Sequence, residues 1–405
     1  MTFDNLLVIA AVAAAIPLLL GFVPWLPVPG PVLEIIAGII LGPAVLDVVH
    51  VDATVQAASV LGLAFLLFLA GLEIDVHQFR GPQARRALDG LAVTVVLGIT
   101  TGYGLHAVGL ALNPLLIGIA LMATSLGLVV PILKDAGVAN RPVGQLTIAG
   151  ASAGEVTAVV LLSVFFSERG GALGGRLLLL GLLALFAAAV ILTVRGAGRS
   201  MRITDVINRL ADTTAQIRVR LAVLLLIGLA TIAANLGFEA ILGAFLAGAL
   251  LRLVDPDAEA THPQFRVKLE GIGYGFLIPV FFVTSGLVFD LHQLTDHPAT
   301  LLRVPLYLAL LLLVRGAPAL LYRTVLTGRE TAAAALLQAS SLPFLVAATQ
   351  IGLAVGAITA ANAAALVAAG LVSVLVYPAT ALALLPRSAN AVQPVTLASL
   401  ADDSM

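Results

Sequence analysis

One acidic residue lies at the centre of a long apolar segment. Glu155 occupies the middle of residues 142–167, and the residues around it are small or carry hydroxyl groups, among them Ser152 and Thr157. A carboxylate at the bilayer centre costs about 3 kcal/mol on insertion scales, and such residues usually mark an ion or proton pathway. Small neighbours let an ion approach, and the hydroxyls can ligate it. The segment predicts a carboxylate that binds a cation or a proton; the alternative is a structural carboxyl paired with a neighbour.

Arg315 is the only basic residue well inside an apolar segment, residues 298–323. A guanidinium keeps its proton inside a protein, so Arg315 is a fixed positive charge. It is predicted to act as a counter-charge to Glu155 or as a gate. The alternative is a side chain that extends toward the membrane surface, because Arg315 lies past the middle of its segment.

Two further apolar segments contain polar breaks. Residues 114–133 include Thr124 and Ser125, with Pro131 after them, and residues 330–351 include Gln338, Ser340, Ser341 and Pro343. Proline removes a backbone donor and frees a carbonyl one turn back. Freed carbonyls and half-helix ends form ion sites in transporters. We therefore predict unwound helices at these two places.

The elements that carry these residues are predicted from the composition. The chain has 405 residues, 60% of them hydrophobic, a mean hydropathy of +1.10, and 11% charged residues. A soluble domain carries about 25% charged residues. A soluble enzyme, a nucleic-acid binder and a disordered chain are therefore excluded. With no Cys there are no disulfides. We predict an all-α polytopic membrane protein.

Hydrophobic windows predict about thirteen spans, although tight junctions at 112/114 and 235/237 leave twelve possible. The windows are 5–23, 28–49, 55–72, 88–112, 114–133, 142–167, 173–195, 217–235, 237–253, 269–289, 298–323, 330–351 and 357–385. The order span, broken span, span occurs in 88–167 and again in 298–385. This repetition predicts inverted repeats.

The basic residues predict an orientation. With the N-terminus outside, 17 of the 21 Lys and Arg residues fall in inner connectors and 3 in outer ones. This bias fits the positive-inside rule and predicts a multi-pass protein of the cell membrane with a cytoplasmic C-terminus. Residues 196–216 alternate charged and apolar side chains and predict an amphipathic helix on the inner surface. Residues 387–405 predict a flexible tail, and no fused nucleotide-binding domain is expected.

Four sequence stretches, taken in order, resemble the monovalent cation–proton antiporter-2 family, which includes the Kef-type potassium systems. They are residues 31–43 (PVLEIIAGIILGP), 61–75 (LGLAFLLFLAGLEID), 242–248 (LGAFLAG) and 279–287 (PVFFVTSGL). The resemblance covers residues 5–385. The family usually has a polar residue followed by Asp at its acid site, where this chain has Gly154 and Glu155.

The resemblance implies a core domain that moves against a dimerising scaffold, with two crossed, unwound helices beside the ion site. The scaffold would comprise 5–72 and 217–289, and the core 88–167 and 298–385. Residues 173–216 would be a linker span and the amphipathic helix. The resemblance places the ion-binding acid on Glu155, the unwound helices on Thr124-Ser125 and Ser340-Ser341, and the embedded basic residue on Arg315. It also implies a homodimer.

These observations predict a secondary active transporter that exchanges K⁺ or Na⁺ for H⁺ by alternating access. Glu155 is the one titrating group placed at the midplane, which predicts electroneutral exchange. An anion or organic-acid carrier, in which Arg315 binds the substrate, and a cation channel stay open as alternatives. The GxSxG pattern of Gly150 to Gly154 lies in a helix, so no hydrolase and no enzyme is predicted. No cofactor, no nucleic acid and no metal beyond the transported cation are expected.

Overall fold

The computed structural model describes residues 3–22, 28–74, 82–166, 173–198, 206, 209–210, 213–254, 263–295 and 298–385. Every regular element in these residues is helical. The first half contains α1 (Asp4–Phe22), α2 (Gly30–Leu41), α3 (Ala53–Leu72), α4 (Pro82–Ala107), α5 (Pro114–Met122), α6 (Leu126–Asp135), α7 (Pro142–Phe165) and α8 (Leu173–Gly198). The second half contains α10 (Ile217–Asn235), α11 (Ala240–Val254), α13 (Pro263–Ile272), η2 (Gly273–Leu277), α14 (Ile278–Leu287), α15 (Leu291–Thr295), α16 (Pro298–Leu311), η3 (Leu312–Gly316), η4 (Ala317–Thr324), α17 (Gly328–Gln338), α18 (Pro343–Ala354) and α19 (Ala360–Leu384).

The all-helical membrane fold is confirmed, and each predicted window contains a helix. Within the described residues, eleven helical segments are long and apolar enough to cross a membrane. Two windows contain shorter apolar helices, α2 with 12 residues and α11 with 15. At 1.5 Å per residue these are about 18 and 22 Å long, short of a hydrocarbon core of about 30 Å. The count of thirteen spans therefore stays a prediction.

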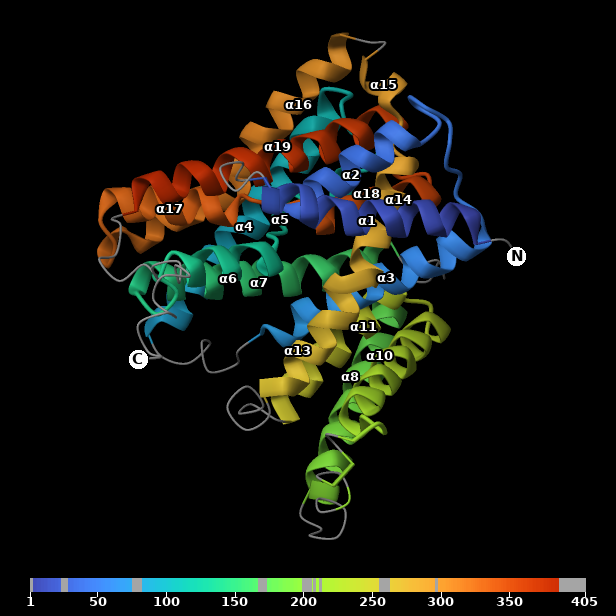
Figure 1. Ribbon diagram of the computed structural model, residues 1–405. Helices are drawn as coiled ribbons and strands as arrows, with labels where there is room; N and C mark the ends of the chain where they lie inside the picture. Colours follow the sequence, from blue (N-terminus) through green and yellow to red (C-terminus); the bar gives the residue numbers. More distant parts are fainter. Residues whose placement is uncertain are drawn as a thin grey trace, which may run out of the picture.

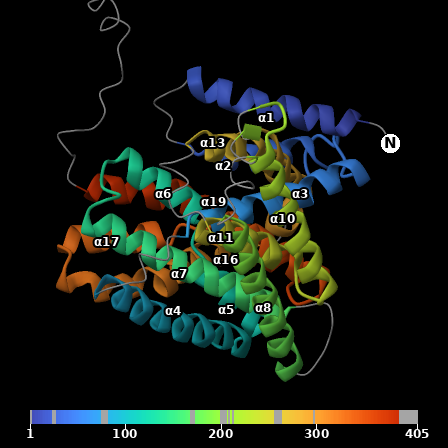
Figure 2. The ribbon, with the colours of Figure 1, turned by 90° about the horizontal axis from the view of Figure 1, so that it is seen from below.

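The helices pack in two groups. In one group α3 contacts α11 and α14, α11 contacts α10, and α14 contacts α2. In the other, α4 packs on α5 and α7, while α19 packs on α16, α17 and α18. Figures 1 and 2 show α4, α6, α7 and α17 on one side of the molecule and α1, α2, α3 and α10 on the other.

Glycines set the close packing within the first group. A Cβ on Gly38 of α2 would overlap the backbone of α14 at Val283 and Gly286, and a Cβ on Gly248 of α11 would overlap the backbone of α3 at Phe68. Backbones that approach this closely need small residues at the contact. Gly38 and Gly248 therefore serve helix packing inside the chain.

Two predicted segments lie outside the described residues. Most of the amphipathic helix expected over 196–216 is not described, and neither is any part of the tail at 387–405. α8 extends to Gly198. The linker span over 173–195 therefore has a helix, and the amphipathic helix stays a prediction.

Candidate ion-binding site

Two broken helices meet near the centre of the second group. α5 and α6 are separated by residues 123–125, and α17 and α18 by residues 339–342. The Ser125 amide donates to the Ser340 carbonyl at 3.0 Å, and the Thr124 hydroxyl donates to the Gln338 carbonyl at 2.5 Å. These bonds satisfy polar groups that the breaks would otherwise leave buried without partners. The prediction of two crossed discontinuous helices is confirmed.

The local sequence explains where each half-helix begins. Pro343 lies in the first turn of α18, where its missing N–H costs nothing and its fixed φ suits a helix start. Ser125 has an extended backbone, with φ −82° and ψ 94°, so α6 restarts at Leu126. The first amides of α6 are left without intrahelical partners, and this makes the helix end a site for negative charge.

Glu155 of α7 is aimed at the start of α6. Its side chain is 5% exposed, and Oε2 accepts a hydrogen bond from the Leu126 amide at 3.1 Å. The amide and the helix dipole both favour an oxygen with negative charge at this point. The carboxyl is thereby held at the break in the neighbouring helix.

Arg315 lies in the core next to the residue that precedes Glu155, and it is 1% exposed. It belongs to η3, a single π-helical turn between α16 and the 3₁₀ turn η4. π-Helical turns are rare and occur often at functional sites. The guanidinium donates from Nε to the Thr124 hydroxyl at 2.7 Å, from Nη1 to the Thr94 hydroxyl at 3.2 Å and from Nη2 to the Gly150 carbonyl at 2.9 Å.

Arg315 and Glu155 are neighbours without being an ion pair. Among the described residues, no guanidinium nitrogen of Arg315 lies within 4.0 Å of a Glu155 oxygen. The guanidinium lies instead against Gly154, where a Cβ would be 2.6 Å from Arg315 Cζ. Glycine at this position therefore makes room for the guanidinium, and the Glu155 carboxylate is left free of a direct charged partner.

The other predicted site residues differ in their surroundings. Ser152 is 1% exposed, and its hydroxyl has no hydrogen-bond partner among the described residues. Ser341 is fully buried, and its backbone is hydrogen-bonded to the Ser373 hydroxyl; in the part of the chain that is described, its own hydroxyl has no partner. The Ser340 hydroxyl donates to the Leu336 carbonyl of the preceding helix, α17. Thr157 is only partly buried.

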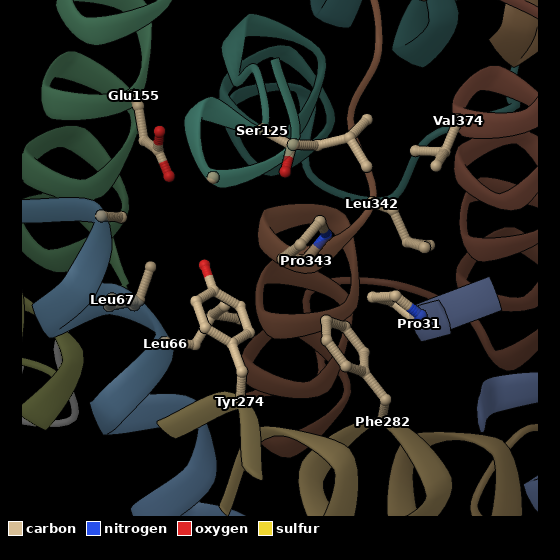
Figure 3. A pocket seen from close by; sticks show the side chains of 13 residues that line it. Pro31, Leu66, Leu67, Ser125, Glu155, Tyr274, Phe282, Leu342, Pro343 and Val374 are labelled. Atoms are coloured by element: carbon tan, nitrogen blue, oxygen red, sulfur yellow. The ribbon is translucent and has the colours of Figure 1, made fainter. Parts of the chain in front are cut away.

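A cavity opens in front of Glu155. About 60 Å³ is available to the centres of water molecules, which is room for several of them because one needs about 10–15 Å³. Figure 3 shows Glu155 pointing into it beside Ser125, with the Tyr274 hydroxyl entering from the opposite side. The lining comes from both helix groups: Pro31, Leu66, Leu67, Ala70, Ser125, Gly127, Leu128, Glu155, Tyr274, Phe282, Leu342, Pro343 and Val374.

Sequence reasoning missed two residues of this region. Thr94 is fully buried in α4, and its hydroxyl donates to the Gly90 carbonyl while it accepts from Arg315. A single threonine in an apolar helix gives no reason to expect a hydrogen bond to a buried arginine. Tyr274 lies on the π-helical turn η2. The alternating glycines at 271, 273 and 275 could have drawn attention to this irregular turn.

In the part of the chain that the structure describes, no three His, Cys, Asp or Glu side chains gather as a metal would require. The polar groups that face the cavity are the carboxylate of Glu155 and the hydroxyl groups of Ser125 and Tyr274. Hard oxygen ligands of this kind suit a small cation, and a carboxylate also takes a proton.

Crossed broken helices around a buried acid and a buried base define the class of protein: a helical membrane transporter. The family described as "Sodium/hydrogen exchanger, transmembrane" matches residues 8–385, and the chain belongs to this family, which is one of transporters.

Individual proteins agree with this assignment. The chain is 34% identical to YjbQ of Bacillus subtilis (strain 168) over 86% of its own length, and it spans 57% of the length of that protein. It is 31% identical to an Na(+)/H(+) antiporter of Enterococcus hirae, over 71% of this chain and 74% of the other. The solved structure of the sodium proton antiporter MjNhaP1 from Methanocaldococcus jannaschii has a similar fold, with a TM-score of 0.66 and 18% identity over 94% of this chain and 98% of the other.

Proposed function

We propose that this chain exchanges a monovalent cation, K⁺ or Na⁺, for protons across a membrane. The observation that carries the proposal is the Glu155 carboxyl, which lies at the crossing of the two breaks, is held by one backbone amide and faces a cavity. A carboxylate in that position can bind a cation or a proton, but not both at once. The match to the Enterococcus hirae antiporter supports the same activity.

We assign the other residues roles around this carboxyl. Ser125 and Ser152 would contribute oxygen ligands, and Thr157 is kept as a further candidate on the same helix. Thr124, Ser340 and Ser341 would hold the two breaks together. Arg315 would fix the break at Thr124 and supply a permanent positive charge.

We further propose that exchange is electroneutral and proceeds by alternating access. Glu155 would carry one unit of charge in either direction, because Arg315 cannot release its proton. Residues 88–167 and 298–385 would move as the core against a scaffold of 5–72 and 217–289. The cavity has walls from both groups, so their relative movement would open or close it.

The chain is also proposed to form a homodimer in the cell membrane, with its N-terminus outside. α1 and α10 are among the least covered spans, with 11% and 22% of their residues buried inside the chain. Such apolar faces need lipid or a second copy against them. The basic residues counted above support the orientation.

An anion carrier is the second candidate, and the residues that line the cavity disfavour it. Arg315, which would bind the anion, does not line the cavity, and it donates to three neutral acceptors. Glu155 does line the cavity, and its charge would repel an anion.

The proposed function is tested with proteoliposomes that hold an internal acid load. Potassium, sodium and choline are added outside in turn, and the internal pH is followed with and without an imposed membrane potential. We expect potassium or sodium, but not choline, to release protons, at a rate that the potential does not change. Flux of the cation without proton release would indicate a channel, and proton release driven only by an organic acid would indicate an anion carrier.

A further inference from the structure

A charged cluster adjoins the cavity on the first helix group. Glu73 directly follows α3, and it lies three and seven residues beyond Ala70 and Leu66, which line the cavity. This spacing places the three residues on one face of the helix. On the facing segment, Glu270 precedes the cavity residue Tyr274 by four positions. Both helices therefore lead from the cavity to the same charged cluster.

The cluster joins two carboxylates through one guanidinium. Arg266 donates from Nη2 to Oε1 of Glu73 at 2.9 Å and from Nε to Oε1 of Glu270 at 2.6 Å. The three side chains carry a formal charge of −1 when both acids are ionised. Glu73 is the most buried of them, with 10% of its side chain exposed against 25% for Arg266 and 37% for Glu270.

One oxygen of this cluster has no partner. Oε2 of Glu73 is buried and accepts no hydrogen bond from any residue that the structure describes. A carboxylate oxygen left unpaired in the interior is costly, and such atoms in native structures call for a ligand, a water or a proton. The charged and titratable groups that face Glu73 from neighbouring elements are Arg266 and Glu270 of α13, Lys134 of α6 and Tyr274 of η2, with Glu155 beyond them.

Lys134 does not fill the vacant position. It is exposed at the end of α6, and within the described residues no ion pair joins it to Glu73. Its positive charge lies on the opposite helix group and acts on Glu73 from a distance. Glu73 Oε2 is thus left without a cationic partner among the described residues, beside two helices that line the cavity.

We propose that Glu73 is a second cation-binding carboxylate, which holds a monovalent cation or a proton at the mouth of the cavity before it reaches Glu155. The proposal rests on the antiport function, because a first binding site at Glu73 contributes to transport only if the ion then binds to Glu155. It assigns to Arg266 the role of holding Oε1, which leaves Oε2 for the ion.

The acidity of Glu73 supports competition between the two ligands. Glu73 lies just outside the spanning segment α3. Burial raises the pKa of Glu73 to about 7, against the lowering effect of Arg266 and Lys134, and Glu270 adds to the increase. As the pH falls through this value the carboxylate becomes protonated and loses its attraction for a cation. Cation affinity at this site should therefore fall on acidification.

The test measures the cation dependence of antiport for wild type and for Glu73→Gln, Glu270→Gln, Glu73→Asp and Glu155→Gln. We expect Glu73→Gln to raise the half-saturating cation concentration about fivefold or more with a maximal rate within about twofold, which is the result of losing a binding group outside the transport step. Glu270→Gln removes the same charge from the same guanidinium and should change the half-saturating concentration less. Glu73→Asp should restore part of the affinity.

If Glu73→Gln and Glu270→Gln raised the half-saturating cation concentration equally, the loss of one negative charge would explain both results and the proposal would be overturned. An unchanged half-saturating concentration in Glu73→Gln would overturn it as well. Failure of the antiport function itself is seen separately, as cation flux by wild type without coupled proton movement. A binding measurement covers the case in which Glu73→Gln does not fold. Crystals of Glu155→Gln soaked in thallium(I) should show an anomalous peak beside Glu73, and no peak there would contradict the site.

Discussion

At the scale of single residues, the site keeps its acid and its base apart. The Arg315 guanidinium donates hydrogen bonds to two threonine hydroxyls and one carbonyl, and the Glu155 carboxyl accepts one from a backbone amide. A directly paired carboxylate would have to break a strong interaction before it could bind an ion. The arrangement leaves one face of the Glu155 carboxyl open to the cavity, as the proposed exchange of ligands requires.

Gly154 provides the most local prediction. We expect Gly154→Ala to destabilise the protein by about 1–3 kcal/mol, because the added methyl would overlap the Arg315 guanidinium in a packed core. Gly174→Ala is the control: nothing lies within 4 Å of a Cβ there, and alanine favours a helix by about 0.4–1 kcal/mol. Thermal unfolding in detergent measures both. A Gly154→Ala protein as stable as the control would show that the guanidinium is free to move aside.

At the scale of elements, the start of α6 is what orients the acid. Leu126 is the first residue of that helix and its amide bonds to Glu155. Proline fits the first position of a helix but has no N–H, and Ser125 already has the extended backbone that proline requires before it. Leu126→Pro thus removes one hydrogen bond and preserves the helix.

We expect Leu126→Pro to raise the half-saturating cation concentration by about tenfold or more, since a hydrogen bond to a charged group contributes about 1.5–3 kcal/mol. Leu126→Ala loses the same buried side chain but keeps the amide, so it separates packing from orientation. Antiport assays on both variants at matched protein levels make the comparison. If the alanine variant is impaired as much as the proline variant, the amide has no special role.

The two breaks could be predicted because their residues are conspicuous in an apolar sequence. Thr124-Ser125 and the run before Pro343 contrast with every neighbour, and Glu155 is the only acid at the centre of a window. The π-helical turns that carry Arg315 and Tyr274 could not be predicted, because they depend on packing between helices and not on residue type. For the same reason the three partners of Arg315 became known only from the structure.

At the scale of the whole molecule, the orientation in the membrane is open to a simple experiment. The chain has no Cys, so a single introduced cysteine is the only reactive thiol. Leu112 and Asn140 are exposed in connectors at opposite ends of the α5–α6 segment. We expect a membrane-impermeant maleimide to label Leu112→Cys in intact cells, and Asn140→Cys only after permeabilisation. The reverse pattern would contradict the orientation drawn from the basic residues.

The proposed movement of one helix group against the other also belongs to this scale. The cavity lies between the groups and has Glu155 on one wall and Tyr274 on the other, as Figure 3 shows. Movement of the core would carry Glu155 and both breaks together, because the hydrogen bonds at Ser125 and Thr124 join the broken helices. The site would travel as a unit and keep its geometry.

The most direct test of the central claim is proton-gradient-driven uptake of radioactive sodium or rubidium into proteoliposomes. Wild type should accumulate one of these ions against its own gradient, and Glu155→Gln should accumulate neither, because the amide can bind no proton and has no charge for the cation. Thermal unfolding and size-exclusion chromatography would establish that the variant is folded. Accumulation by Glu155→Gln at the wild-type rate would contradict the account, since another group would then couple the two ions.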